Sequence, residues 1–126
     1  MGAAGEARKK ILVVDDDENI LKVIQAQLEF GGFLVSLAKN AHEMMLAVSQ
    51  SDYDAVLLDL GLPDMDGLEA LKKIKNFKPK LPVIIVTGNH EEEKGRRAIE
   101  IGAWDYVTKP IDFKYLKNIL FIQSQT

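Results

Sequence analysis

The sequence contains no cysteine and little that would break regular structure. Its 126 residues include only 4 prolines and 9 glycines. The absence of cysteine excludes a disulfide scaffold and any metal site built on thiolates. No repeat or low-complexity segment occurs beyond the first ten residues, and 47% of the residues are hydrophobic. A chain of this length and composition predicts one globular domain with a sizeable core.

The sequence also lacks a long apolar run and an excess of positive charge. No run approaches the roughly 18 to 20 apolar residues of a membrane-spanning helix, and residues 1–10 have no apolar core of a signal peptide. There are 16 basic and 19 acidic residues, for a net charge of -3. Without a basic field, binding to nucleic acid or to a membrane is not expected. We expect a cytoplasmic domain in which residues 1–9 are a flexible arm or a cloning remnant.

Short apolar runs alternate with longer segments of helical period. Each run has the length of a strand buried on both faces, and the runs occupy residues 11–14, 33–37, 55–58, 83–86 and 106–107. Helices are predicted between and after them at residues 19–30, 40–50, 67–77, 91–101 and 112–123. Parallel neighbouring strands need crossover connections. The alternation therefore predicts a single α/β domain, with a five-stranded parallel sheet and five helices in a flavodoxin-like, doubly wound (βα)5 fold.

Several details of the helices can be predicted as well. Asp17 is placed to cap the first helix and Asn40 the second. Gly95 lies in the middle of the fourth helix, where glycine costs about 1 kcal/mol relative to alanine, so this helix is predicted to be easily displaced. The helical period places four apolar residues and one glutamine on one side of the first helix, namely Ile20, Val23, Ile24, Gln27 and Leu28.

Polar residues end three of the five predicted strands and follow the fifth. Asp15 and Asp16 follow the first strand, Asp59 the third and Thr87 the fourth, and Lys109 comes after the fifth. Ligands bind at the carboxyl edge of such a sheet, where the strand order reverses. Carboxylates roughly 5 Å apart repel by about 3 kcal/mol, so the cluster needs a cation. Mg²⁺ suits carboxylates together with waters and a phosphate oxygen, and the sequence therefore predicts a magnesium site.

Four stretches in this order carry a resemblance to a known family. They are "ILVVDDDE", "DAVLLDLGLPDMDG", "LPVIIVTG" and "GAWDYVTKP". Together they make the chain resemble the receiver domain of two-component response regulators, in the CheY-like superfamily, with the domain at residues 10–124. The resemblance implies that Asp59 accepts a phosphoryl group from a histidine kinase or a histidine phosphotransfer protein. It also implies a phosphorylation-switched signalling domain rather than an enzyme.

The resemblance further implies how Mg²⁺ would be held. Asp16 and Asp59 would bind it directly together with the backbone carbonyl of Gly61. Asp15 would act mostly through a metal-bound water. Gly61 carries no side chain over the site, and in this family its position influences how water reaches the acyl phosphate.

The same resemblance implies a switch and an output surface. Thr87 and Lys109 would bind the phosphoryl oxygens, and Tyr106 would change rotamer as Thr87 is drawn inward. The bond between Lys109 and Pro110 is expected to be cis. The response should reach the face formed by the fourth helix, fifth strand and fifth helix, which suits a protein partner or a homodimer and carries Arg96, Arg97, Trp104, Lys114 and Lys117.

Three other functions compete with this interpretation. A phosphohydrolase of the haloacid dehalogenase type needs a second aspartate two residues after its nucleophile. No aspartate stands two residues after Asp59, although Asp15 and Asp17 have this spacing. A chain of this length also leaves no room for the cap domain of such enzymes. A flavodoxin-type module needs a glycine-rich or hydroxyl-rich loop after the first strand, where this chain has aspartates. A receiver-like interaction module that is never phosphorylated is disfavoured, because the residues needed for phosphorylation are all present, namely Asp15, Asp16, Asp59, Thr87 and Lys109.

Overall fold

Five strands and five helices alternate along the chain in a computed structural model that describes residues 8–88 and 90–123. Most of the predicted arm, residues 1–7, lies outside the described residues. No helix in the described part has both the length and the apolar character needed to cross a membrane. The elements are β1 (Lys10–Val14), α1 (Glu18–Phe30), β2 (Leu34–Ala38), α2 (Ala41–Gln50), β3 (Ala55–Asp59), α3 (Gly67–Phe77), β4 (Val83–Thr87), α4 (Glu92–Ile101), β5 (Asp105–Thr108) and α5 (Phe113–Gln123).

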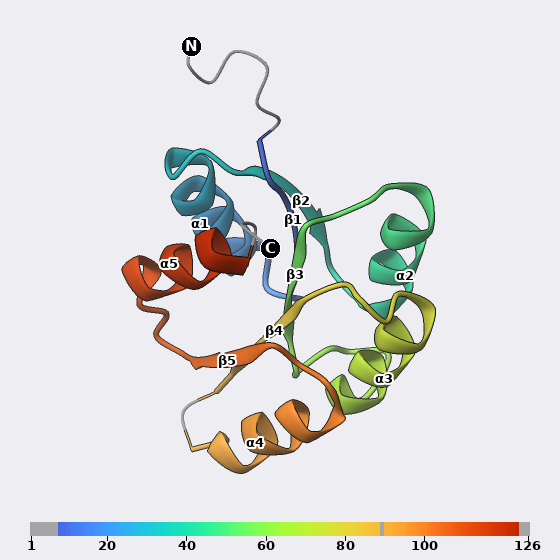
Figure 1. The fold of residues 1–126 in the computed structure, drawn as a ribbon. Helices are drawn as coiled ribbons and strands as arrows, with labels where there is room; N and C mark the ends of the chain where they lie inside the picture. The colour runs from blue at the N-terminus through green and yellow to red at the C-terminus, as the bar shows by residue number, and fades with distance from the viewer. Residues whose placement is uncertain (1–7, 89, 124–126) are drawn as a thin grey trace.

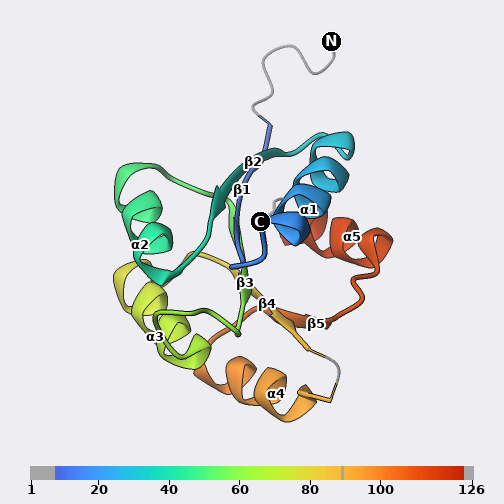
Figure 2. The same cartoon turned by 180° about the vertical axis from the view of Figure 1, so that it is seen from behind.

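The strands form one parallel sheet in the order β2-β1-β3-β4-β5. Helices α1 and α5 cover one face, and α2, α3 and α4 cover the other (Figures 1 and 2). From β1 the chain runs outward to β2 and then returns past β1 to β3, so the strand order reverses between β1 and β3. The predicted flavodoxin-like α/β fold is confirmed, and the reversal point is where such sheets bind ligands.

The sheet separates two hydrophobic clusters. Along β1, Leu12 and Val14 pack toward α2, α3 and α4, whereas Ile11 and Val13 pack toward α1 and α5, as the alternation of a strand requires. Strands β3 and β4 are buried throughout. The prediction of burial on both faces is wrong for β2, where Leu34 is 44% exposed. This strand lies at the edge of the sheet and has a neighbour on one side only.

Helix α1 buries a different stripe from the one predicted, since Leu21 was not in the predicted set. Its buried residues are Leu21, Ile24 and Leu28, and Val23, which was predicted on the apolar side, is 53% exposed. A spacing of three and then four residues keeps the buried stripe on one face of a helix, and this stripe faces the cluster shared with α5. The predicted cap is confirmed, since the Asp17 side chain accepts hydrogen bonds from two backbone amides of the first turn.

Two side chains cap the beginning of α2, and one of them comes from a distant loop. Asn40 accepts a hydrogen bond from the amide of Glu43 at 2.8 Å, as predicted. The carboxylate of Asp64, in the loop after β3, accepts from the amides of Ala41 at 3.0 Å and His42 at 3.1 Å. The amide of Ala41 is the main reason that the pKa of Asp64 is lowered. Asp64 thereby ties the loop after β3 to the start of α2.

Candidate functional site

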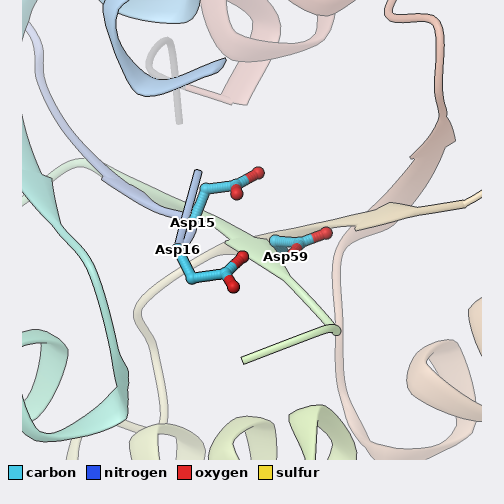
Figure 3. Close-up of side chains that lie close together, drawn as sticks. All are labelled: Asp15, Asp16 and Asp59. Atoms are coloured by element: carbon cyan, nitrogen blue, oxygen red, sulfur yellow. The ribbon is translucent and has the colours of Figure 1, made fainter. Parts of the chain in front are cut away.

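Three carboxylates meet at the carboxyl edge of the sheet. Oxygen atoms of Asp15, Asp16 and Asp59 all lie within 4.8 Å of one another (Figure 3). The ladder between β1 and β3 ends with Val14 opposite Leu58, so the next residues on the two strands, Asp15 and Asp59, are neighbours. Asp15 and Asp59 are buried and Asp16 is exposed. The predicted convergence is confirmed at the point where the strand order reverses.

Lys109 brings the positive charge that faces this cluster. Its Nζ lies 3.3 Å from Oδ1 of Asp59 and 3.5 Å from Oδ2 of Asp15. Its backbone amide donates a hydrogen bond to the carbonyl of Thr87 at 2.9 Å, which fixes the loop after β5 against the end of β4. The peptide bond to Pro110 is cis, as expected. One ammonium therefore stands among three carboxylates.

The electrostatics of the site reflect this shortage of positive charge. Burial raises the pKa of Asp59 and the charge of Asp15 raises it further, while Lys109 and the backbone of Gly61 offset only part of the effect. For Lys109, burial favours the neutral amine, but the carboxylates of Asp59 and Asp15 outweigh it and raise the pKa of the ammonium. A further cation at this place would stabilise the ionised form of Asp59.

The donor atoms fit a hard divalent cation. Oδ1 of Asp15 accepts a hydrogen bond from the amide of Asp17 at 2.9 Å, whereas its buried Oδ2 has no hydrogen-bond partner among residues 8–88 and 90–123. Gly61 lies against the cluster, because a Cβ at this position would stand 3.4 Å from Oδ2 of Asp59. Carboxylate and carbonyl oxygens are the ligands that Mg²⁺ prefers. The residues present therefore fit a magnesium ion.

The two residues predicted to form a switch lie on the neighbouring strands β4 and β5. Thr87 is fully buried at the end of β4, and its hydroxyl donates a hydrogen bond to the carbonyl of Val107 at 3.4 Å. Tyr106 is half-buried on β5, and its ring packs against α4 at Gly95. Thr87 thus belongs to the edge that carries the carboxylates, and Tyr106 lies between the sheet and α4.

The loop after β3 is built more tightly than a turn alone would require. A Cβ on Gly67 would stand 2.4 Å from both the Cα and the carbonyl oxygen of Leu60, so only glycine lets α3 begin so close to the residue after Asp59. Asp66 caps α3, where its side chain accepts a hydrogen bond from the amide of Glu69. The second contact of this loop, from Asp64 to α2, was missed, because nothing in the sequence links an aspartate to amides 22 and 23 residues away.

One alternative function loses its structural basis here. The pair with the spacing of a haloacid dehalogenase nucleophile and acid was Asp15 and Asp17. The Asp17 carboxylate instead accepts hydrogen bonds from Asn19 at 2.9 Å and Ile20 at 3.3 Å in the first turn of α1. It acts as a helix cap, and its carboxylate is not part of the acidic cluster.

Sequence comparison relates the chain to bacterial regulators. It is 41% identical over 110 residues to the transcriptional regulatory protein ZraR of Klebsiella oxytoca, a match that covers 87% of this chain and 25% of ZraR. It is 38% identical over 106 residues to the transcriptional regulatory protein YkoG of Bacillus subtilis, covering 84% of this chain and 46% of YkoG. The chain thus spans between a quarter and a half of the length of these relatives.

Solved structures show the same fold at similar identity. A CheY-like response regulator receiver domain from Methanospirillum hungatei superposes with a TM-score of 0.85 at 34% identity, covering 94% of this chain and 98% of that one. The receiver domain of NtrX from Brucella abortus gives 0.88 at 31% identity, covering 92% and 98%. The family model of the response regulator receiver domain matches residues 11–121. The chain therefore belongs to the response regulator receiver domain family.

Proposed function

We propose that this domain, at residues 10–124, accepts a phosphoryl group on Asp59 from a histidine kinase or a histidine phosphotransfer protein in the cytoplasm. The observation that carries the proposal is the buried carboxylate of Asp59 at the open edge of the sheet, 3.3 Å from the ammonium of Lys109. Mg²⁺, held by Asp15, Asp16, Asp59 and the carbonyl of Gly61, would neutralise charge on the transferred group.

The chemical step needs little from the protein beyond position and charge. A carboxylate oxygen of Asp59 attacks the phosphorus of a phosphohistidine, the new P–O bond forms, and the P–N bond breaks with its electron pair going to the imidazole. After the transfer, the ammonium of Lys109 binds one phosphoryl oxygen. The hydroxyl of Thr87 donates a hydrogen bond to a second phosphoryl oxygen. The domain assists only its own phosphorylation and dephosphorylation, so it acts as a signalling switch and not as an enzyme.

A small phosphodonor tests the acceptor directly. Acetyl phosphate with Mg²⁺ is expected to label the chain once, on Asp59, and chelation of Mg²⁺ should abolish the label because charge on the transferred group is then no longer neutralised. Mass spectrometry of proteolytic fragments locates the modification. Asp52→Asn, at an exposed aspartate paired with Lys78, is the matched control and should be labelled normally.

Two results would contradict this assignment. One is a label on a different residue, and the other is labelling that persists without Mg²⁺. A chain that takes no label from acetyl phosphate or from a phosphotransfer protein would instead be the unphosphorylated interaction module.

The output surface that we propose is the face of α4, β5 and α5. Thr87 leads toward α4, and the backbone of Lys109 is bonded to Thr87, so a change at the phosphoryl group reaches this face first. Ile99, Trp104 and Tyr115 are 41%, 51% and 47% exposed there. Apolar and aromatic side chains mixed with charge suit a protein partner or a second copy rather than nucleic acid. A groove of about 550 Å³ runs over it, lined by Glu92, Asp105, Tyr106, Val107, Thr108, Pro110, Asp112 and Tyr115.

Beryllofluoride, a stand-in for the acyl phosphoryl group, is expected to change the amide resonances of residues 87–117 most strongly when Mg²⁺ is present. Two-dimensional NMR makes the comparison, and sedimentation shows whether weak dimers form. Tyr106→Ala should reduce the response of α4 and α5 while Asp59 remains able to accept phosphate, because the ring is not a ligand. Perturbation centred on α1 and α2, or loss of phosphorylation in the variant, would contradict this route.

A further inference from the structure

Helix α4 has a gap in its buried side, and the ring of Tyr106 fills it. Gly95 lies in the middle of α4 and is buried. A Cβ at this position would stand 2.5 Å from Cδ2, 2.7 Å from Cγ and 2.8 Å from Cε2 of Tyr106. The optimal van der Waals separation of two non-bonded carbon atoms is roughly 3.5–4.0 Å. The ring therefore occupies the space that any other residue at position 95 would need.

Turning the ring about its own axis would not make room for a side chain. The Cγ atom is the root of the ring and stays in place during such a rotation, and it already lies 2.7 Å from the Cβ position. Either α4 must move away from the sheet or the whole side chain of Tyr106 must adopt another rotamer. Helix α4 is anchored by the fully buried Ala98, which belongs to the cluster shared with α2 and α3. The ring is the part that is easier to displace.

The position of the ring coincides with one arrangement of Thr87. Tyr106 pairs with Ile85 in the sheet, and Thr87 follows two residues later on β4, so its side chain is directed to the same face. The Thr87 hydroxyl donates to the carbonyl of Val107 on β5. In this arrangement the Thr87 hydroxyl is bonded to β5 while the ring lies against Gly95, and we interpret these two positions as the resting, disengaged state of the proposed switch.

We infer that Gly95 is a positioning residue that holds the ring of Tyr106 in its disengaged place and thereby sets the resting balance of the switch. This inference rests on the proposed function, in which Tyr106 responds to Thr87. A glycine inside a helix weakens it, and the sequence alone suggested that α4 is easily displaced for this reason. The structure assigns the glycine a different purpose, because the missing side chain is replaced by an aromatic ring from β5.

Gly95→Ala in the native chain tests this inference. The added Cβ is expected to move the ring from its place, which NMR of the Tyr106 ring would show before any ligand is added. The state of the switch that binds beryllofluoride is then more populated. The apparent affinity for beryllofluoride with Mg²⁺ should therefore rise at least about threefold. Glu100→Ala, at an exposed position of the same helix, is the control and should change neither quantity.

The Tyr106→Ala background separates a specific contact from a general effect on the helix. There the alanine at position 95 meets no ring, so the affinity for beryllofluoride should stay unchanged and the melting temperature should rise through the better helix propensity. Equal effects of Gly95→Ala in both backgrounds, or an unmoved ring, would overturn the inference. If Gly95→Ala alone fails to fold, folding of the double variant supports the inference, and failure of both overturns it.

The same variants keep the inference distinct from the proposed function. If beryllofluoride does not bind the native chain at all, the proposed function fails. The melting temperatures of the four proteins still report on the contact in that case. Non-additive changes would support the close approach of Gly95 and Tyr106, and additive changes would contradict it.

Discussion

Asp59→Asn is expected to lose all labelling by acetyl phosphate and, at neutral pH, to be more stable than the native chain. The amide keeps the shape of the side chain but removes one of three carboxylates whose oxygen atoms lie within 4.8 Å of one another. We expect a gain of about 1 kcal/mol or more, seen as a rise in Tm of roughly 3–6 °C. A substitution that abolishes function while it stabilises the fold is the mark of a functional site held under repulsion.

The pH dependence of this gain follows from the raised pKa of Asp59. Burial and Asp15 raise the pKa above the ordinary value of 3.8, so the folded state binds a proton more tightly than the unfolded state does. The stability contributed by the protonated acid is fully present below pH 3.8 and is lost as the pH rises through the folded pKa. The advantage of Asp59→Asn should therefore be largest at neutral pH and shrink on acidification toward pH 4.

Magnesium should act in the same direction as the substitution. At ten times its dissociation constant it is expected to stabilise the native chain by about 1.4 kcal/mol, and Asp59→Asn by less. Thermal unfolding in Mg²⁺ and in a chelator measures both effects. Asp52→Asn is the control: Asp52 lies just before β3, at the amino ends of the strands, and this variant should have the Tm of the native chain. An Asp59→Asn variant that melts lower than the native chain at neutral pH would contradict the repulsion.

Lys109→Met is expected to destabilise the fold by about 1–3 kcal/mol at neutral pH, because it leaves two buried carboxylates without their counter-charge. The estimate is below that for a fully buried pair, since the Lys109 side chain is 31% exposed. Labelling by acetyl phosphate should slow by at least about tenfold, because the ammonium no longer stabilises the transferred group. Unfolding in urea and the rate of labelling measure the two effects.

A double variant shows whether Lys109 stabilises the fold through its charge. In the Asp59→Asn background Lys109→Met should lower the free energy of unfolding by less, because one of the two carboxylates near the ammonium is already gone. Lys94→Met is the matched control, because Lys94 pairs with Glu91 at a half-exposed surface position and should change stability by no more than about 0.5 kcal/mol. Equal losses in both backgrounds would show that Lys109 acts through packing instead of charge.

The fold and the composition of the site were accessible from the sequence because both depend on local patterns. Apolar runs of strand length marked β1, β3 and β4, and the residue that ends each strand is fixed by its position in the chain. Parallel strands bring their carboxyl ends to one edge. Asp15, Asp59 and Lys109 could therefore be placed together before any distance was known.

The remainder depends on partners that are distant in the sequence. Leu34 has the pattern of a buried strand residue, and only the strand order shows that β2 has a neighbour on one side. Val23 lies beside the buried stripe of α1, and helical period alone does not decide which flank meets the sheet. Gly95 looks like a weak point in a helix until the ring of Tyr106 is found against it. The errors at Leu34 and Val23, and the contact at Gly95 that the sequence did not reveal, all depend on distant partners and not on a local preference.

The bond from Asp64 to the start of α2 limits how this domain can be recombined with its relatives. The loop that follows β3 and the first turn of α2 form one unit, although the bonded residues Asp64 and His42 are 22 positions apart in the sequence. A chimera that imports a foreign loop at positions 60–66 but keeps residues 40–43 would leave the amides of Ala41 and His42 without this carboxylate. A chimera should therefore take residues 40–43 and 60–66 from the same parent, even though the sequence alone would favour a boundary directly after β3.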